Sequence, residues 1–264
     1  MGKLWIILML IGTTAFGQLN VVESFTIGEV RQVVSKVLDE TRTLNIYLPN
    51  SYTTDSLREY PVIFLLDGSK DEDFIHISGL VQFGSFPWLN KVEESIVVGI
   101  ENIDRKRDFT HPPKDSTYKI NTPTAGGSAN FIRFIAQELQ PMINRTYRTN
   151  GQRTLIGQSL GGLLATEILL KHNELFDKYI IISPSLWWDN ERLLQTEFPS
   201  SIAVESVYIG VGKEGRIMRS VAKKLYKKVK GAQLEGTKII FNYFKQCDHG
   251  DVLHLAVYDA FEKL

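Results

Sequence analysis

The segment Gly157-Gln158-Ser159-Leu160-Gly161 constrains the fold of this chain more than any other feature. It has the spacing G-x-S-x-G, with an apolar run, Thr154-Leu155-Ile156, before it and small residues after it. Strand, sharp turn and helix form the context in which this spacing exposes a serine hydroxyl at the edge of a sheet. Side chains at either glycine would clash across the turn. The pattern predicts a nucleophilic Ser159; the plainer alternative is a serine that caps an ordinary helix.

Length and charge limit the classes of protein that this sequence fits. The chain has 264 residues, enough for one large α/β domain or two small ones. Its 30 basic residues balance 30 acidic ones, which argues against nucleic acid or a strongly anionic polymer as a partner. A single cysteine, Cys247, excludes an internal disulfide and a cysteine-rich metal site.

The first residues have the pattern of a targeting segment. Lys3 precedes a short apolar run from Leu4 to Ile11, and Ala15-Phe16-Gly17 places small residues where a signal peptidase reads them. We therefore expect residues 1–17 to be a signal peptide and residues 18–264 to be a single domain. The mature protein is expected to be exported, periplasmic or secreted, without a stable membrane anchor. An uncleaved anchor or a buried N-terminal strand is the alternative.

Strand and helix patterns alternate along most of the chain. Short or continuous apolar runs predict strands at 25–27, 32–35, 42–48, 61–66, 94–100, 179–183, 207–210 and 238–244. Helical spacing is found at 130–143, after the G-x-S-x-G segment to about 172, at 218–230 and at 252–264. Residues 101–129 read as a long irregular loop. The order predicts an α/β protein with a mostly parallel central sheet, helices on both faces and antiparallel strands at the N-terminal edge.

A nucleophilic serine requires a general base, and the chain has five histidines. Chemistry in open α/β sheets lies at the carboxyl ends of the strands. His172 lies at the far end of the helix that follows Ser159, and His254 lies inside the final helix. His249 directly follows the last strand and is therefore the predicted base. The alternative is that His249 only caps the final helix.

The acid that orients the histidine should lie between the serine and the histidine in chain order. Glu214 follows the strand at 207–210 by a few residues, which is the position expected for the third member of a triad. Asp248 or Asp251 could steady the histidine instead, or no acid is needed. The oxyanion hole is expected to use the backbone N–H of Leu160 and one N–H from the loop after Leu66. This set of residues implies no metal and no organic cofactor.

Several segments together carry a resemblance to a known family: Thr41-Arg42-Thr43, Tyr60 to Gly68, Arg105 to Thr110, Gly157 to Gly162, Ile182 to Trp188, and Asp248-His249-Gly250. From about Phe25 to Leu264 the chain resembles the esterase D superfamily of serine esterases, and most of all its branch of trilactone siderophore esterases. The resemblance implies an α/β-hydrolase fold without a large cap, Ser69 as the second oxyanion donor, and Glu214 as the acid. S-formylglutathione hydrolases have a His-Ser-Met-Gly-Gly-His segment, from which this chain departs.

The expected substrate is a small or medium ester, either a small molecule or linked to a saccharide. Trp187 and Trp188 follow a strand end and are candidates to contact an aryl or acyl group, unless one of them packs in the core. Arg107 is a candidate to bind an anionic or catecholate group; the alternative is a buried pair with Asp108 or another carboxylate that holds the long loop. Carboxylic-ester hydrolysis is the leading expectation. An acyltransferase that uses the same residues, or an inert binding protein on a hydrolase scaffold, are the alternatives.

Overall fold

The structure, a computed structural model, describes residues 20–198, 204–232 and 234–264. Within these residues eight strands form one sheet in the order β1-β2-β4-β3-β5-β6-β7-β8. β1 and β2 are antiparallel, and so are β2 and β4, whereas all pairs from β4 through β3 to β8 are parallel. The strands are β1 (Glu29–Ser35), β2 (Glu40–Tyr47), β3 (Tyr60–Leu66), β4 (Ile96–Ile100), β5 (Thr149–Gln158), β6 (Lys178–Ile182), β7 (Ser206–Gly212) and β8 (Lys238–Phe244).

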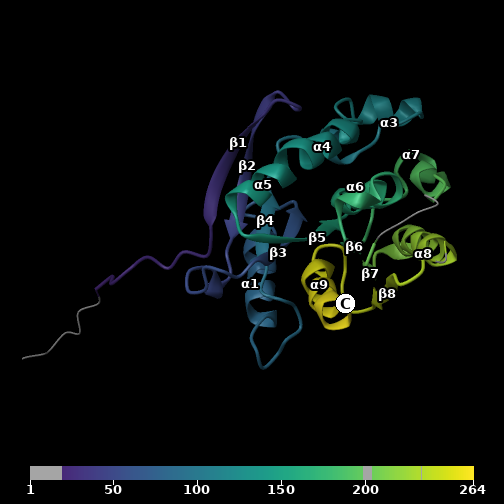
Figure 1. The fold of residues 1–264 in the computed structure, drawn as a ribbon. Coiled ribbons are helices and arrows are strands. Elements are labelled where there is room, and N and C mark those ends of the chain that lie inside the picture. The colour runs from purple at the N-terminus through teal and green to yellow at the C-terminus, as the bar shows by residue number, and fades with distance from the viewer. Residues whose placement is uncertain (1–19, 199–203, 233) are drawn as a thin grey trace, which may run out of the picture.

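Helices cover both faces of the sheet (Figure 1). The longer ones are α1 (Phe74–Gly84), α6 (Leu160–Lys171), α8 (Gly215–Gly231) and α9 (Val252–Lys263). Shorter ones are α2 (Arg105–Phe109), α3 (Ser116–Asn121), α4 (Ser128–Phe134), α5 (Gln140–Thr146) and α7 (Trp188–Glu191). A π turn (Ile135–Leu139) joins α4 to α5, and 3₁₀ turns lie at Asn50–Tyr52, Asn173–Leu175 and Arg192–Gln195.

The core is divided into two layers by the alternation of side chains along the strands. Val62, Phe64 and Leu66 of β3 pack in the layer that contains α4, α6 and α8. Ile63 and Leu65 pack in the other layer, with α1 and α9. Every residue of β3 is buried, which explains why its sequence is an unbroken apolar run.

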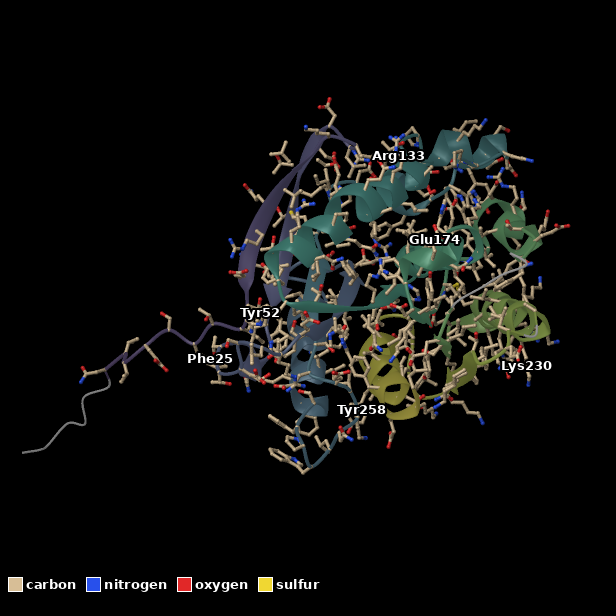
Figure 2. All side chains as sticks on the ribbon, viewed as in Figure 1. Phe25, Tyr52, Arg133, Glu174, Lys230 and Tyr258 are labelled. Atoms are coloured by element: carbon tan, nitrogen blue, oxygen red, sulfur yellow. The ribbon has the colours of Figure 1, made fainter. Side chains whose placement is uncertain are left out.

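The predicted fold class is confirmed: the protein has a mixed α/β fold with a mostly parallel sheet, flanked by helices. The strand expected at 25–27 is wrong, since this segment has no strand partner among the described residues and Phe25 is exposed, on the extended segment that precedes β1 (Figure 2). The loop expected at 101–129 contains α2 and α3. The predicted signal peptide, residues 1–17, lies outside the described residues. In the part of the chain that is described, no helix has the length and apolar character needed to cross a membrane.

A buried ion pair fixes α2 against the sheet. The guanidinium of Arg42 on β2 is fully buried, and its Nη1 lies 2.8 Å from both Asp108 Oδ2 and Glu40 Oε1. A buried charge is tolerated only when it is paired and hydrogen-bonded, so the position of Asp108 is tightly constrained. Because α2 has only five residues, this pair also determines where Arg105, at the start of α2, is placed.

Candidate active site

Ser159 lies on a sharp turn between β5 and α6. Its backbone has φ 59° and ψ −118°, a strained conformation for a residue with a side chain. A Cβ atom at Gly157 would lie 2.5 Å from the carbonyl oxygen of Gly161, so only glycine allows the turn to close. The Ser159 N–H donates to Ile182 O at 3.1 Å, which ties the turn to the end of β6. The serine is thereby held at the carboxyl edge of the sheet.

His249 and Glu214 are brought together by the loops after β8 and β7. His249 Nδ1 lies 2.5 Å from Glu214 Oε2. The Glu214 side chain is 4% exposed and also accepts hydrogen bonds from Gly212 N at 2.9 Å and from the Ser183 hydroxyl. The His249 side chain is half exposed. Glu214 is therefore the carboxylate that the structure pairs with His249.

Asp248 and Asp251, the alternative acids, shape the histidine loop instead. Asp248 N donates to Asp251 Oδ1 at 2.7 Å, and Gly250 N donates to Asp248 Oδ1 at 2.8 Å. The carbonyl oxygen of His249 accepts from Gln158 Nε2 at 2.6 Å, which joins this loop to the turn that carries Ser159. These contacts fix the backbone on both sides of the histidine.

The Glu214–His249 contact shifts the pKa of both groups. Burial opposes ionisation of Glu214, but the hydrogen bonds from His249, Ser183 and Gly212 outweigh it and hold the Glu214 pKa below its usual value. The hydrogen bond from Glu214 raises the pKa of His249, against the opposing effect of burial. The imidazolium form of His249 is thus stabilised, as a base that accepts a proton during a reaction requires.

Two hollows meet at Ser159 and His249. The first is lined by Ser159, Ser185, Trp187, Glu214, Met218, Asp248 and His249. The second is more polar and is lined by Asp67, Glu72, Asp73, Arg105, Gln158, Ser159, His249 and Gly250. In the second hollow, burial and the like charges of Asp67 and Glu72 raise the pKa of Asp73 to about 6. A bound molecule at Ser159 would therefore meet one aromatic wall and one charged wall.

The Ser159 hydroxyl, within the described part of the chain, bonds to Ser185 Oγ at 3.3 Å rather than to His249. The Leu160 N–H is the first of α6, so it precedes the first hydrogen bond within the helix. Ser69 follows Gly68, whose backbone lies so close to Gly99 that a Cβ there would be 2.3 Å from Gly99 Cα. Ser69 lines neither hollow, although Asp67, two residues before it, lines the second one.

Two of the three predicted substrate-binding side chains, Trp188 and Arg107, line neither of the two hollows. Trp187 is 37% exposed and lines the first hollow, but Trp188 is 3% exposed and its Nε1 donates to His111 O at 3.2 Å. Trp188 is a core residue: it packs in a buried apolar layer, and the His111 carbonyl is the acceptor that a buried indole N–H needs. Arg107 pairs with Glu40 and Asp108, each at 2.7 Å, and contacts neither hollow.

Arg105, which sequence reasoning missed, is the arginine of the second hollow. It forms a bidentate pair with Asp67, at 2.6 Å and 2.9 Å, and its Nη2 donates to Gln158 O at 3.3 Å. Arg105 and Arg107 were indistinguishable in a run of basic residues. Ser183 and Ser185 lie in a segment that carries the family resemblance but were given no role, and the sequence around Met218 carries no chemical signal. Within the described ranges, no group of three or more His, Cys, Asp or Glu is arranged to hold a metal ion.

The sequence profile of the Esterase family matches residues 35–237 of the 264, and the chain belongs to this family. Among curated relatives, the ferri-bacillibactin esterase BesA of Bacillus subtilis is 34% identical over 180 residues. That match covers 63% of this chain and 61% of BesA, so the chain spans less than two thirds of the length of this relative. The uncharacterized protein YbbA of the same organism is 29% identical over 195 residues, 72% of this chain and 75% of YbbA.

Solved structures show the same fold. The BES protein from Bacillus cereus superposes with a TM-score of 0.80 at 27% identity, covering 95% of this chain and 98% of that protein. An IroE-like serine hydrolase from Shewanella oneidensis gives a TM-score of 0.77 at 29% identity, over 89% of this chain and 79% of the other. These neighbours confirm an α/β-hydrolase-like fold.

The shifted pKa of His249 predicts a titration that depends on Glu214. By NMR, the His249 imidazole should titrate above the usual histidine pKa, and Glu214→Gln should move the midpoint to lower pH because the charge that stabilises the imidazolium is lost. Asp248→Asn, the matched control on the histidine loop, should move the midpoint less. A larger downward shift in Asp248→Asn than in Glu214→Gln would make Asp248 the partner of His249.

Proposed function

We propose that this protein is a carboxylic-ester hydrolase that acts through an acyl-enzyme on Ser159. The observation that carries the proposal is the 2.5 Å contact of His249 Nδ1 with the buried Glu214, beside a serine held on a strained strand-to-helix turn. Membership of the Esterase family supports the same reaction class.

In the proposed reaction, substrate binding displaces the Ser159 hydroxyl from Ser185 and brings it to His249, whose free ring nitrogen accepts the proton as Ser159 Oγ attacks the ester carbonyl. Catalytic hydrogen bonds often form only in the substrate complex, so the contact with Ser185 is compatible with this step. His249 then protonates the departing alcohol. Water, activated by the same histidine, releases the acid and restores Ser159.

The developing oxyanion needs donors that are in place before the reaction. We propose the backbone N–H groups of Leu160 and Ser69 for this role. The Leu160 N–H is free of any helical partner, and the amino end of α6 adds a favourable dipole. The contact of Gly68 with Gly99, together with the Arg105–Asp67 pair, gives the loop that carries Ser69 little freedom.

Labelling with an organofluorophosphonate tests the proposed nucleophile. The probe should attach to a single site in the parent protein, and Ser159→Ala should remove the label and lower ester hydrolysis by roughly a millionfold. Intact mass and peptide mapping would locate the adduct. Ser185→Ala provides the neighbouring-serine control and should still be labelled. Equal labelling of Ser159→Ala and the parent protein would rule out Ser159 as the nucleophile.

The proposed substrate is a small or medium ester with an aromatic or acyl group that lies against Trp187 and Met218. Curated relatives are named as esterases of ferri-bacillibactin and enterobactin, which supports a siderophore lactone. An aromatic ester on a saccharide has the same reacting group and fits the same aromatic wall. The half-exposed Trp187 side chain is suited to contact a planar ring from one face.

A hydrolysis panel tests the substrate class. We expect ferric trilactone siderophore or feruloyl esters to be cleaved with higher kcat/KM than short p-nitrophenyl esters, and long-chain acyl esters to be the poorest. Trp187→Ala should lower kcat/KM for the aryl esters by roughly tenfold, in line with the loss of an aromatic contact. Trp187→Phe is the matched control and should retain most of the activity. A preference for long-chain esters would contradict the proposed small or medium substrate. More ester product than free acid in the presence of an alcohol acceptor would indicate acyl transfer.

We also propose that residues 1–17 are a signal peptide and that the mature protein is exported to the periplasm or secreted. The charged start, the short apolar run and the small residues before Gln18 support this.

A further inference from the structure

The turn Ser183-Pro184-Ser185 follows β6 and contains no member of the proposed triad. Its two hydroxyl groups nevertheless contact opposite members of the proposed triad. The Ser183 hydroxyl donates to Glu214 Oε1, and Ser185 Oγ lies 3.3 Å from Ser159 Oγ. Both serines are buried, at 0% and 3% exposure, although Ser185 lines the first hollow.

The backbone of this turn is held from three sides. Ser183 has φ 44°, in the left-handed region that residues other than glycine rarely adopt, and its N–H donates to Gly210 O at 2.8 Å. The N–H of Ser185 donates to Ser159 O at 2.9 Å, and its carbonyl accepts from Trp188 N at 3.0 Å. A turn that is kept in a strained conformation by this many contacts is over-determined by its surroundings.

Helix α6 packs directly on the turn. A Cβ atom at Gly162 would lie 3.0 Å from Pro184 Cα and 3.0 Å from Ile182 O. The absence of a side chain at Gly162 therefore lets the turn come close to the start of α6. The same close approach brings the two hydroxyl groups to Glu214 and Ser159.

The contact with Ser183 determines how Glu214 presents its two oxygens. An ionised carboxylate can only accept hydrogen bonds, so the Ser183 hydroxyl is the donor. Ser183 and Gly212 N both bond to Oε1, which leaves Oε2 for His249. Without the Ser183 hydroxyl, a buried oxygen would lose one of its two donors, and the carboxylate would be freer to rotate away from the histidine.

We propose that the Ser183-Pro184-Ser185 turn is a positioning element for the whole triad, an inference that rests on the esterase function proposed above. Ser183 fixes the carboxylate of Glu214 so that Oε2 faces His249. Ser185 holds the Ser159 hydroxyl inside the first hollow until a substrate arrives. Neither serine contacts the reacting atoms of the substrate in this scheme.

The test uses two variants that remove the same hydroxyl but differ in backbone preference. Ser183→Ala keeps a Cβ at a left-handed φ, whereas Ser183→Gly relieves that strain. Both should lower kcat/KM by about 10- to 100-fold, which is the loss found in metalloenzymes when a hydrogen-bond partner that orients a metal-binding side chain is removed. In both, the acid limb of the pH profile of kcat/KM should move to lower pH, in the direction of Glu214→Gln, because the weaker contact with Glu214 stabilises the imidazolium less.

Ser206→Ala is the matched control for loss of a buried hydroxyl. Ser206 lies at the start of β7, 2% exposed, and its hydroxyl has no hydrogen-bond partner among the described residues. This variant should leave both the rate and the acid limb unchanged. If the limb of Ser183→Ala and Ser183→Gly stays in place or moves to higher pH, Ser183 does not position Glu214. If only Ser183→Ala shifts it, the backbone and not the hydroxyl is responsible, which also overturns the proposal.

Ser185→Ala tests the other end of the turn. It should slow labelling of Ser159 by the fluorophosphonate several-fold and leave the acid limb in place, since the Glu214–His249 contact is untouched. Labelling at or above the parent rate would contradict the role given to Ser185. Parent protein that neither hydrolyses esters nor takes the label would refute the proposed function itself. An active parent with unshifted Ser183 variants would refute only the positioning role.

Discussion

The close approach of Gly157 to Gly161 is the contact on which the site depends. It lets β5 turn into α6 without a gap, and it forces Ser159 into a backbone conformation with positive φ that its own propensity disfavours. The cost of that conformation is offset by the parallel sheet, which anchors Ser159 N to β6 and packs α6 against a buried layer of side chains. The strain at Ser159 therefore persists because the surrounding packing leaves the chain no alternative.

The charged groups of the site follow a second constraint, the need to satisfy a buried carboxylate. Glu214 is nearly inaccessible to water, and an unpaired charge there would cost several kcal/mol. Donors from three different loops meet this need: Gly212 after β7, Ser183 after β6 and His249 after β8. The same hydrogen bonds that stabilise the carboxylate also orient the imidazole. The stability of this edge of the sheet and the chemistry that we propose for it thus use the same contacts.

Sequence patterns predicted the parts of the structure that are governed by local physics. Continuous apolar runs at 61–66 and 179–183 identify strands buried on both faces, and strand ends place Ser159, Glu214 and His249 at one edge. The sequence did not predict which way the side chains of short segments point. Arg105 and Arg107 are two positions apart on a five-residue helix, so they point about 200° apart. Ion pairs with residues distant in the sequence, Asp67 for Arg105 and Glu40 for Arg107, fix which one lines the hollow. The same holds for Trp187 and Trp188, whose exposure depends on the distant carbonyl of His111.

The acyl-enzyme is the species that the proposed chemistry cannot avoid, and mass spectrometry of the protein quenched in acid during ester turnover tests it most directly. The mass of the protein should rise by that of the acyl group, and peptide mapping should place the group on Ser159. An activated ester should also acylate the His249→Ala variant. Because that variant lacks the base that activates water, a larger fraction of it than of the parent protein should carry the acyl group when the reaction is quenched. Turnover of the ester with no covalent adduct at any time, or with the acyl group on another residue, would contradict a nucleophilic Ser159.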